Sequence, residues 1–232
     1  MMILFTILTF LIYRLSKMAH AKWSLFLLHP LLLAPILLIA LISVTHVSAD
    51  RYLEDTKWLT HLLGPATVAF AVPIYKNLSV IKKYVGTIII SITSGSLVAI
   101  FSTFGLSKLF DLKSDFITSI LPRSITTPIA IEVSKEIGGL PTLTTVFVII
   151  TGIIGSVVGP SVIKGLSIKT PIAKGLALGM GAHGAGTNKA FEYGNQEATF
   201  SSLAMIFAAV ITLIWGAILI PPLMNFNIHH LF

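Results

Sequence analysis

LPRSITTPIAIEVSK, the stretch from Leu121 to Lys135, places an arginine, a proline and a glutamate in the middle of an otherwise apolar chain. Burying Arg123 or Glu132 in hydrocarbon is costly, and Pro128 removes a backbone hydrogen bond from any helix interior. Such a stretch is tolerated at membrane depth only where the unwound backbone is buried in protein or lines a water-filled cavity. It therefore predicts a broken helix beside a polar site.

A second stretch of the same kind, GAHGAGTNKAFE, runs from Gly181 to Glu192. Its glycines surround a histidine and predict another helix break between Ala182 and Gly186. Discontinuous helices of transporters meet near the bilayer midplane, where their free N–H groups face an anion. We interpret the two stretches as the facing halves of one such site.

The composition identifies the class of protein. Hydrophobic residues make up 55% of the 232 residues and charged residues 11%, against about a quarter charged in soluble domains. Long Leu/Ile runs without alternation exclude a transmembrane barrel, so we expect an all-α polytopic protein whose first partner is the lipid bilayer. The net charge of +7 comes from short loops, where basic residues set orientation, and predicts no nucleic-acid partner.

About eight hydrophobic segments are expected, with room for membrane-spanning helices of ~20 residues. The charged run from Asp50 to Asp55 is predicted to be a loop between two of them. The expected segments are about Met2 to Ser16, Trp23 to Val47, Thr56 to Tyr75, Tyr84 to Leu106, Lys113 to Ile137, Thr142 to Ile163, Pro171 to Asn195 and Phe200 to Leu223.

Two of these segments, 113–137 and 170–195, can either cross the bilayer or return as re-entrant hairpins. If every segment crosses, the basic loop from Lys164 to Lys174 falls outside, against the positive-inside rule. If these two return, the loop falls inside. The charges therefore favour hairpins, whereas the segment lengths allow both.

Internal similarity suggests a repeated, transporter-like architecture. TPIAIE at 127–132 has a counterpart in TNKAFE at 187–192, and GSVVGP at 155–160 has one in GAILIP at 216–221. The similarity predicts repeat units 113–165 and 170–223 within a single domain 1–232, each a broken helix followed by an intact one. Because matches among Gly, Ala and Thr arise readily by chance in membrane chains, the repeat is a hypothesis.

The candidate substrate site follows from the two breaks. Arg123 can bind a carboxylate through two parallel hydrogen bonds. Thr126 or Thr127 suits the N-cap of a half-helix that begins after Pro128, and Thr187 or Gly186 suits one that begins after Gly186. The complete set of predicted substrate-binding residues is Arg123, Ser124, Thr126, Thr127, His183, Gly184, Gly186, Thr187 and Asn188.

Other interpretations of the charged residues remain open. Arg123 can be a structural charge paired with Glu132 or a carbonyl, and His183 can serve packing alone. Glu132 and Glu192 fit structural pairing or surface exposure better than proton coupling. Lys189 lies three residues before Glu192, a spacing that predicts a local ion pair.

Catalytic constellations are absent from the sequence. It contains no cysteine, GxSxG, HExxH, P-loop or metal-type histidine pair. We therefore expect a protein that is not an enzyme and that has no cofactor and no metal.

The chain resembles the LrgB/CidB family over nearly its whole length. The resemblance rests on GPAT at 64–67 with PIYK at 73–76, on LPRSITTPIAIEVS, and on KGLALGMGAHGAGTNKAFE at 174–192. PRSIT followed by IEVSKEIGG is closer to the CidB side. Asn188-Lys189 departs from the family pattern, in which a small residue more often precedes a basic one.

The resemblance implies a protein of the bacterial plasma membrane that modulates murein hydrolase activity and autolysis with a small LrgA/CidA-like, holin-type partner. It also implies transport of a small carboxylate anion of the pyruvate, lactate or glycolate class, which agrees with broken helices around an arginine. The alternative is an interaction protein that regulates the partner's pore without moving solute. Whether the chain forms a homo-oligomer is left open.

Overall fold

The computed structural model describes residues 1–23, 26–69 and 71–225, and within these residues all regular structure is helical. The predicted all-α class is confirmed. The chain divides into two compact units, Met1–Val72 and Pro73–Phe232. The prediction of a single domain 1–232 is not tested by this division and stays a prediction.

In the first unit, side-chain hydrogen bonds join the apolar helix α1 (Met2–Trp23) to the charged helix α3 (Ala49–His61). Tyr52 is hydrogen-bonded to Thr9 at 2.7 Å, and the Trp58 indole donates to the Thr6 hydroxyl at 3.0 Å. The other elements of the unit are η1 (Phe26–Leu28), α2 (Pro30–Val44) and α4 (Leu63–Ala69). The charged run 50–55, predicted to be a loop, is helical, because Ser48 caps α3 by accepting from the Arg51 amide.

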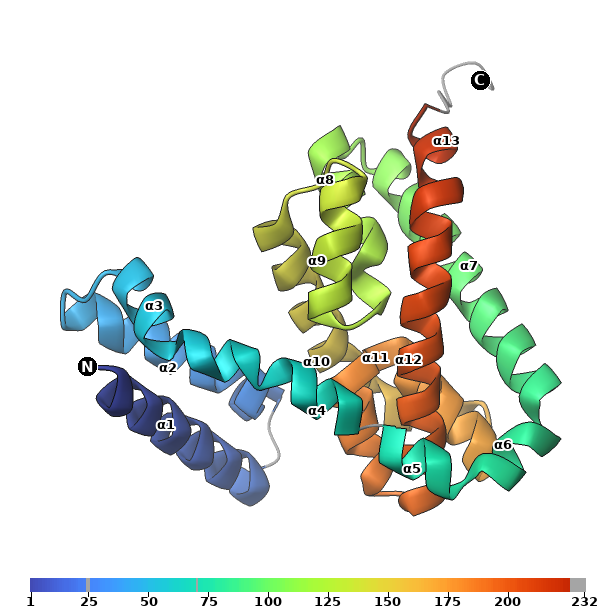
Figure 1. Cartoon of the computed structure of the whole chain (residues 1–232), viewed down its shortest axis with the longest axis horizontal. Helices are drawn as coiled ribbons and strands as arrows, with labels where there is room; N and C mark the ends of the chain where they lie inside the picture. Colours follow the sequence, from blue (N-terminus) through green and yellow to red (C-terminus); the bar gives the residue numbers. More distant parts are fainter. Residues whose placement is uncertain (24–25, 70, 226–232) are drawn as a thin grey trace. The chain divides into compact units, whose positions relative to one another are not determined.

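The second unit contains three long helices and two interrupted ones, all visible in Figure 1. Its elements are α5 (Ala71–Lys76, which spans the unit boundary), α6 (Leu78–Lys83), α7 (Val85–Leu109), α8 (Ser114–Ile120), η2 (Leu121–Ser124), α9 (Thr127–Glu136), α10 (Pro141–Gly165), α11 (Pro171–Phe191), α12 (Asn195–Ile218) and α13 (Ile220–Asn225).

Among the described residues, four helices are long and apolar enough to cross a membrane: α1, α7, α10 and α12. The helix α2 is apolar but shorter. The helices α7 and α10 match the predicted segments 84–106 and 142–163 closely. The helix α12 begins and ends five residues before the predicted segment 200–223, and α1 extends the first segment to Trp23. The number of about eight segments stays a prediction, because the other segments form shorter or interrupted helices.

The segment 113–137 folds back on itself. The chain descends through α8 and η2, turns at Ile125 and Thr126, and returns through α9. The Leu140 amide donates to the Ser119 hydroxyl at 2.8 Å, so the two ends of the segment lie together. These two ends form the base of the fold-back, and the buried Thr144 hydroxyl of α10 is hydrogen-bonded there to the Ser119 carbonyl and the Ser134 hydroxyl. We call residues 114–139 hairpin 1.

The helix α11 also folds back, at His183, whose backbone angles (φ 40°, ψ −119°) are not helical. A Cβ added to Gly186 would overlap the Leu178 carbonyl, although a straight helix would hold residues eight apart about 12 Å from each other. Leu178 and Ala190 also share one buried cluster. The arms 171–182 and 184–191 are therefore packed side by side, and we call them hairpin 2.

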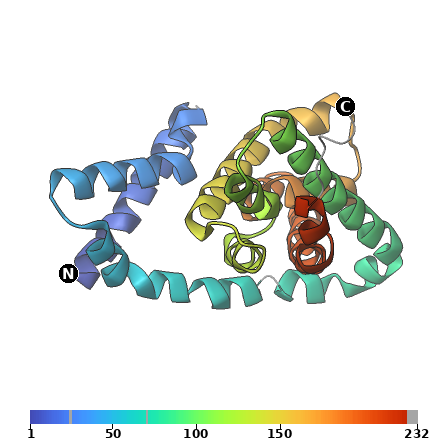
Figure 2. The ribbon, with the colours of Figure 1, turned by 90° about the horizontal axis from the view of Figure 1, so that it is seen from above.

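The two hairpins start from opposite ends of the second unit. Hairpin 1 precedes α10 and hairpin 2 follows it, so the length of α10 separates their bases (Figure 1). Seen from above, hairpin 1 lies among α7, α10 and α12, and contacts with all three agree with that view (Figure 2). The two hairpins therefore pack against the long helices from opposite ends of the second unit.

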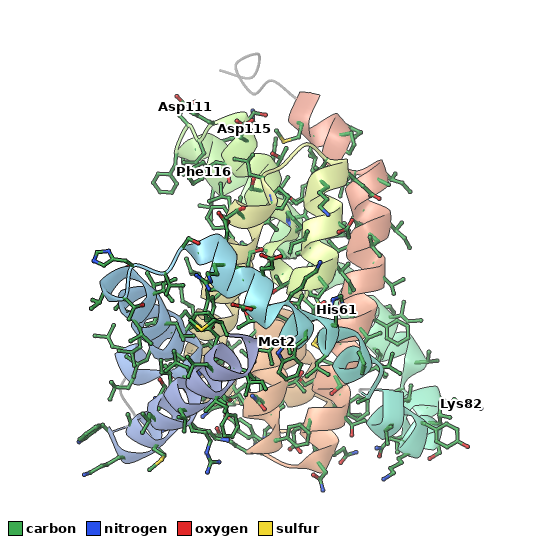
Figure 3. The ribbon with its side chains drawn as sticks, turned by 60° about the vertical axis from the view of Figure 1, so that its left-hand side comes forward. Met2, His61, Lys82, Asp111, Asp115 and Phe116 are labelled. Carbon is green, nitrogen blue, oxygen red and sulfur yellow. The ribbon has the colours of Figure 1, made fainter. Side chains whose placement is uncertain are left out.

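The charges at the two ends of this unit differ. One end carries Asp111 and Asp115 beside Lys108 and Lys113, and Lys82 lies at the other end (Figure 3). That second end also carries the remaining basic loops, with Lys76, Lys83, Lys164, Lys169 and Lys174. Because basic loops face the cytoplasm, we assign the Lys82 end to the inside, which is the orientation that hairpins, rather than crossing segments, predict.

Candidate functional site

Hairpin 1 presents Arg123 at its tip. Pro122 lies at the start of η2 and Pro128 in the first turn of α9, positions at which a missing N–H costs little. Between these starts, Ile125 and Thr126 are extended. The sequence therefore produces two short helices with an unwound connection, as predicted.

The Arg123 guanidinium is half-buried and bonded only to hydroxyl groups among the described residues. Its Nη2 donates to Thr103 Oγ1 of α7 at 2.8 Å, and its Nη1 lies 3.5 Å from Ser124 Oγ. The Thr103 hydroxyl in turn donates to the Ala99 carbonyl. Both recorded partners are neutral, so the guanidinium has no negatively charged partner among the described residues.

The predicted alternative pairing of Arg123 with Glu132 is wrong. Glu132 pairs instead with Lys135, at 2.8 Å, on an exposed face of α9. The predicted pair of Lys189 with Glu192 is confirmed at 2.6 Å. These two pairs are the ion pairs found within the described part of the chain, and neither involves Arg123.

A cavity of about 500 Å³ opens beside Arg123. Its walls come mainly from α10 and are largely apolar, with Thr151 as a second polar residue. Hairpin 2 contributes Ala177, Leu178 and Gly181 to the same cavity. The structure thus brings the two predicted stretches to one space, through Arg123 on one side and Gly181 on the other.

The tip of hairpin 2 is held against the same turn of α10. His183 is 8% exposed, and its Nε2 donates to the Val148 carbonyl at 3.0 Å. A Cβ at Gly152 would lie 2.7 Å from the His183 ring, so the glycine makes room for the imidazole. Thr151, in the same turn, lines the cavity together with Arg123.

The remaining hairpin 2 residues of the predicted set have different surroundings. Thr187 is buried, and its hydroxyl contacts the His183 carbonyl at 3.1 Å and Ser201 Oγ at 3.0 Å. Gly186 packs on the first arm, Gly184 is half-buried, and Asn188 is exposed. None of these residues, nor His183, lines the cavity beside Arg123.

The predicted half-helix starts are right for hairpin 1 and displaced for hairpin 2. Thr126 is the N-cap of α9, but its side chain makes no capping hydrogen bond, and Thr127 is the first helical residue. The amides of Ile129 and Ala130 already donate to the Thr126 carbonyl. In hairpin 2 the break lies at His183, so Thr187 is one turn inside the second arm rather than at its cap.

Sequence reasoning missed several residues that shape the site. Thr103 and Thr151 are each one hydroxyl among several in their helices, and Val148 contributes only its carbonyl, so the sequence carries no signal for them. Trp215 of α12 has a buried indole N–H without a hydrogen-bond partner among the described residues. It packs on the cluster that contains Leu121 of η2.

Comparisons with known proteins agree with one another. A model of the LrgB-like family matches residues 9–222. A Bacillus subtilis protein named "Uncharacterized protein YwbG" is 45% identical over 206 residues, 89% of this chain and 92% of that protein. "Holin-like protein CidB" of Staphylococcus epidermidis is 38% identical over 221 residues, 95% of each chain. The protein of the same name from Staphylococcus aureus (strain Mu50) is 36% identical over the same share.

No solved structure matches this chain. The family match covers most of both compact units, and the relatives align over nearly their full lengths. Together with the four apolar helices, these matches identify a multi-pass bacterial membrane protein. The chain belongs to the LrgB-like family.

Proposed function

We propose that this protein carries small monocarboxylates, of the pyruvate, lactate and glycolate class, across the bacterial plasma membrane. One observation carries the proposal: two hairpins that start from opposite ends of the second unit line one cavity, and Arg123 in that cavity has no carboxylate partner among the described residues. A cation held at that depth is costly unless it serves a polar ligand or a pathway.

Arg123 is the anion-binding group in this proposal. Its guanidinium fork matches a carboxylate, and Ser124, Thr126 and Thr127 are half-buried at the same tip. The apolar walls of the cavity suit a methyl or methylene group next to that carboxylate. A volume of about 500 Å³ accommodates such an anion together with water.

Hairpin 2 forms the opposite wall in this proposal. Its residue Gly181 lines the cavity and, having no side chain, allows close approach of a ligand to the backbone. His183 and Thr187 hold the tip in place rather than bind substrate, because their hydrogen bonds are made within the fold. Asn188, being exposed, lies outside the binding set.

Two glycines that correspond in the proposed internal repeat each contact a hairpin, although at different positions along it. Gly155 of α10 faces Gly181 and Ala182 of hairpin 2, and its counterpart Gly216 of α12 faces Val133 of hairpin 1. The helices α10 and α12 therefore each contact, at a glycine, the hairpin that belongs to the other repeat unit. Inverted units that exchange contacts in this way can rock against each other and alternate access to a shared site.

We further propose that the effect on murein hydrolase activity and autolysis follows from this transport. The relatives named "Holin-like protein CidB" suggest that effect, and a small LrgA/CidA-like membrane protein is the expected partner. In this view the partner modulates the carrier, and no catalytic step by the chain is required. Assembly of several copies is compatible with the proposal.

Uptake into proteoliposomes containing this chain alone tests the proposal. Radiolabelled pyruvate, lactate and glycolate are supplied to wild type, Arg123→Ala, Arg123→Lys and the matched control Lys135→Ala. Lys135 lies on the same hairpin but is exposed. We expect saturable uptake that Arg123→Ala abolishes, that Arg123→Lys weakens because Lys lacks the planar fork, and that Lys135→Ala leaves unchanged.

Two outcomes would overturn the proposal or part of it. Uptake that persists in Arg123→Ala removes this residue from the site. Absence of uptake of all three anions favours the alternative function, an interaction protein that regulates a holin-like partner's pore. In that case the glycine-rich helix faces, rather than Arg123, are expected to control autolysis.

A further inference from the structure

A second cavity, of about 870 Å³, lies on the opposite side of the first arm of α11. Its walls include Lys83 and Tyr84 at the start of α7, Thr170 before α11 and Gln196 in the first turn of α12. All of these residues belong to the basic end of the unit. The cavity therefore begins at the end that we assign to the cytoplasm.

From that end the cavity extends along α7 to half the depth of a bilayer. Its α7 wall is the stripe Thr87, Ser91 and Gly95, spaced at every fourth residue. Gly95 lies ten residues after Val85, the first residue of α7, which corresponds to about 15 Å of helix, against a hydrocarbon core of about 30 Å. The far end of the cavity thus lies near the level at which substrate is expected.

The stripe places two hydroxyl-bearing side chains, Thr87 and Ser91, on the exposed surface of α7. Thr87 and Ser91 are exposed, and among the described residues neither hydroxyl has a hydrogen-bond partner. The other exposed face of α7 is mainly apolar, with Ile90 at 69% and Val98 at 67% exposed, and the exposed Ser94 lies between them. Unpaired hydroxyls are favourable in contact with water and unfavourable in hydrocarbon. The α7 surface is therefore divided into a lipid side and a cavity side.

Met180 closes the deep end of the cavity. A Cβ built on Gly95 lies 3.1 Å from Met180 Cε, so the thioether rests against the glycine. The next residue, Gly181, lines the cavity beside Arg123, and Ala177 lines both cavities. One layer of α11 side chains and the Met180–Gly95 contact thus separate the two spaces. Met is the apolar side chain most able to change rotamer.

We propose that this cavity is the cytoplasmic vestibule of the carrier, and that Met180 against Gly95 is the gate between the vestibule and the Arg123 site. The inference rests on the proposed function. Lys83 and the neighbouring lysines raise the local concentration of small anions at the mouth. Displacement of Met180, with or without movement of hairpin 2, connects the vestibule to Gly181 and Arg123.

The chain contains no cysteine, so single cysteines report accessibility without a background. Thr87→Cys, Ser91→Cys and Gly95→Cys are compared with the lipid-side controls Ile90→Cys and Val98→Cys. A membrane-impermeant, charged thiol reagent is added to inside-out and to right-side-out vesicles. We expect labelling at 87 and 91 from the cytoplasmic side only, slower labelling at 95, and none at 90 and 98.

The gate is tested in the Gly95→Cys background. Met180→Ala should raise the labelling rate at 95 severalfold, whereas Met180→Leu, which keeps the bulk of the side chain, should leave it unchanged. Labelling at 87 and 91 that does not exceed labelling at 90 and 98, or that occurs equally from the outer side, overturns the vestibule. An unchanged rate in Met180→Ala overturns the gate.

The labelling experiment needs no transported substrate, so its failure is separable from failure of the proposed function. Cytoplasmic labelling without carboxylate uptake retains the vestibule and rejects the substrate class. Uptake that depends on Arg123, combined with an unlabelled stripe, retains the carrier and rejects this route.

Discussion

At the scale of single residues, the hydrogen bond from Arg123 to Thr103 fixes the direction of the guanidinium. Thr103 is buried in α7, and its oxygen lies 2.8 Å from Arg123 Nη2. Its hydroxyl donates a hydrogen bond to the Ala99 carbonyl. The threonine therefore accepts from the arginine without competing for an anion. We assign it a positioning role, because it acts on substrate through Arg123.

Removal of that acceptor should weaken binding more than turnover. Thr103→Val keeps the shape but loses the hydroxyl, and a hydrogen bond to a charged group contributes about 1.5–3 kcal/mol. We expect KM for carboxylate uptake to rise about tenfold with little change in maximal rate. Uptake kinetics in proteoliposomes measure both quantities.

Thr103→Ser is the matched control, since it retains the acceptor and should restore KM. If Thr103→Val and Thr103→Ser change uptake equally, the residue acts through packing and the positioning role is wrong. If neither changes KM, Arg123 is oriented by other contacts.

The residue scale also shows where sequence reasoning stops. Arg123 stands out because charge is costly in an apolar chain, and its position at a break was predictable from Pro122 and Pro128. Thr103 lies twenty residues earlier as one hydroxyl among many, and no pattern links it to the arginine. The break in hairpin 2 was predicted among glycines, yet the left-handed residue is His183, because burial of its ring against Gly152 outweighs backbone preference.

At the scale of elements, glycines let the hairpins approach the long helices. A side chain at Gly155 would overlap the Gly181 carbonyl and lie 2.7 Å from the Ala182 Cβ, both at the hairpin 2 tip. Backbone atoms cannot retreat as a flexible side chain can. The glycine at position 155 therefore sets the distance between α10 and the tip of hairpin 2.

We expect Gly155→Ala to destabilise the protein by about 1–3 kcal/mol through overpacking and to reduce carboxylate uptake. Thermal unfolding in detergent and uptake in proteoliposomes are the measurements. Gly165→Ala, in the last turn of the same helix with open space around it, should leave both unchanged. Equal effects of the two substitutions would show that helix propensity, rather than contact with hairpin 2, limits position 155.

The element scale explains which parts of the fold were predictable. Long apolar runs predicted α7, α10 and α12 well, because about twenty apolar residues must form a spanning helix in lipid. Hydropathy could not decide whether segments 113–137 and 170–195 cross or return, since each arm is about half a bilayer long. Long-range contacts, such as Ser119 with Leu140 and Leu178 with Gly186, show that each segment folds back on itself.

At the scale of the whole molecule, the two hairpins determine which loops share a side of the membrane. If both hairpins return, the start and the end of hairpin 1 face outward together, and the start and the end of hairpin 2 face inward together. If both segments cross, the members of each pair lie on opposite sides. The basic loops predict the inward side for hairpin 2.

Four single-cysteine variants distinguish these topologies, because the native chain has no thiol. Lys113→Cys precedes hairpin 1 and Glu136→Cys lies at the end of its second arm, and Lys169→Cys and Glu192→Cys flank hairpin 2; all four native residues are exposed. We expect an impermeant thiol reagent to label 113 and 136 in intact cells, and 169 and 192 only after the cells are opened. Each pair then serves as its own control. Opposite labelling within either pair would mean that the segment crosses, and the two tips would no longer approach a shared site from opposite faces of the membrane.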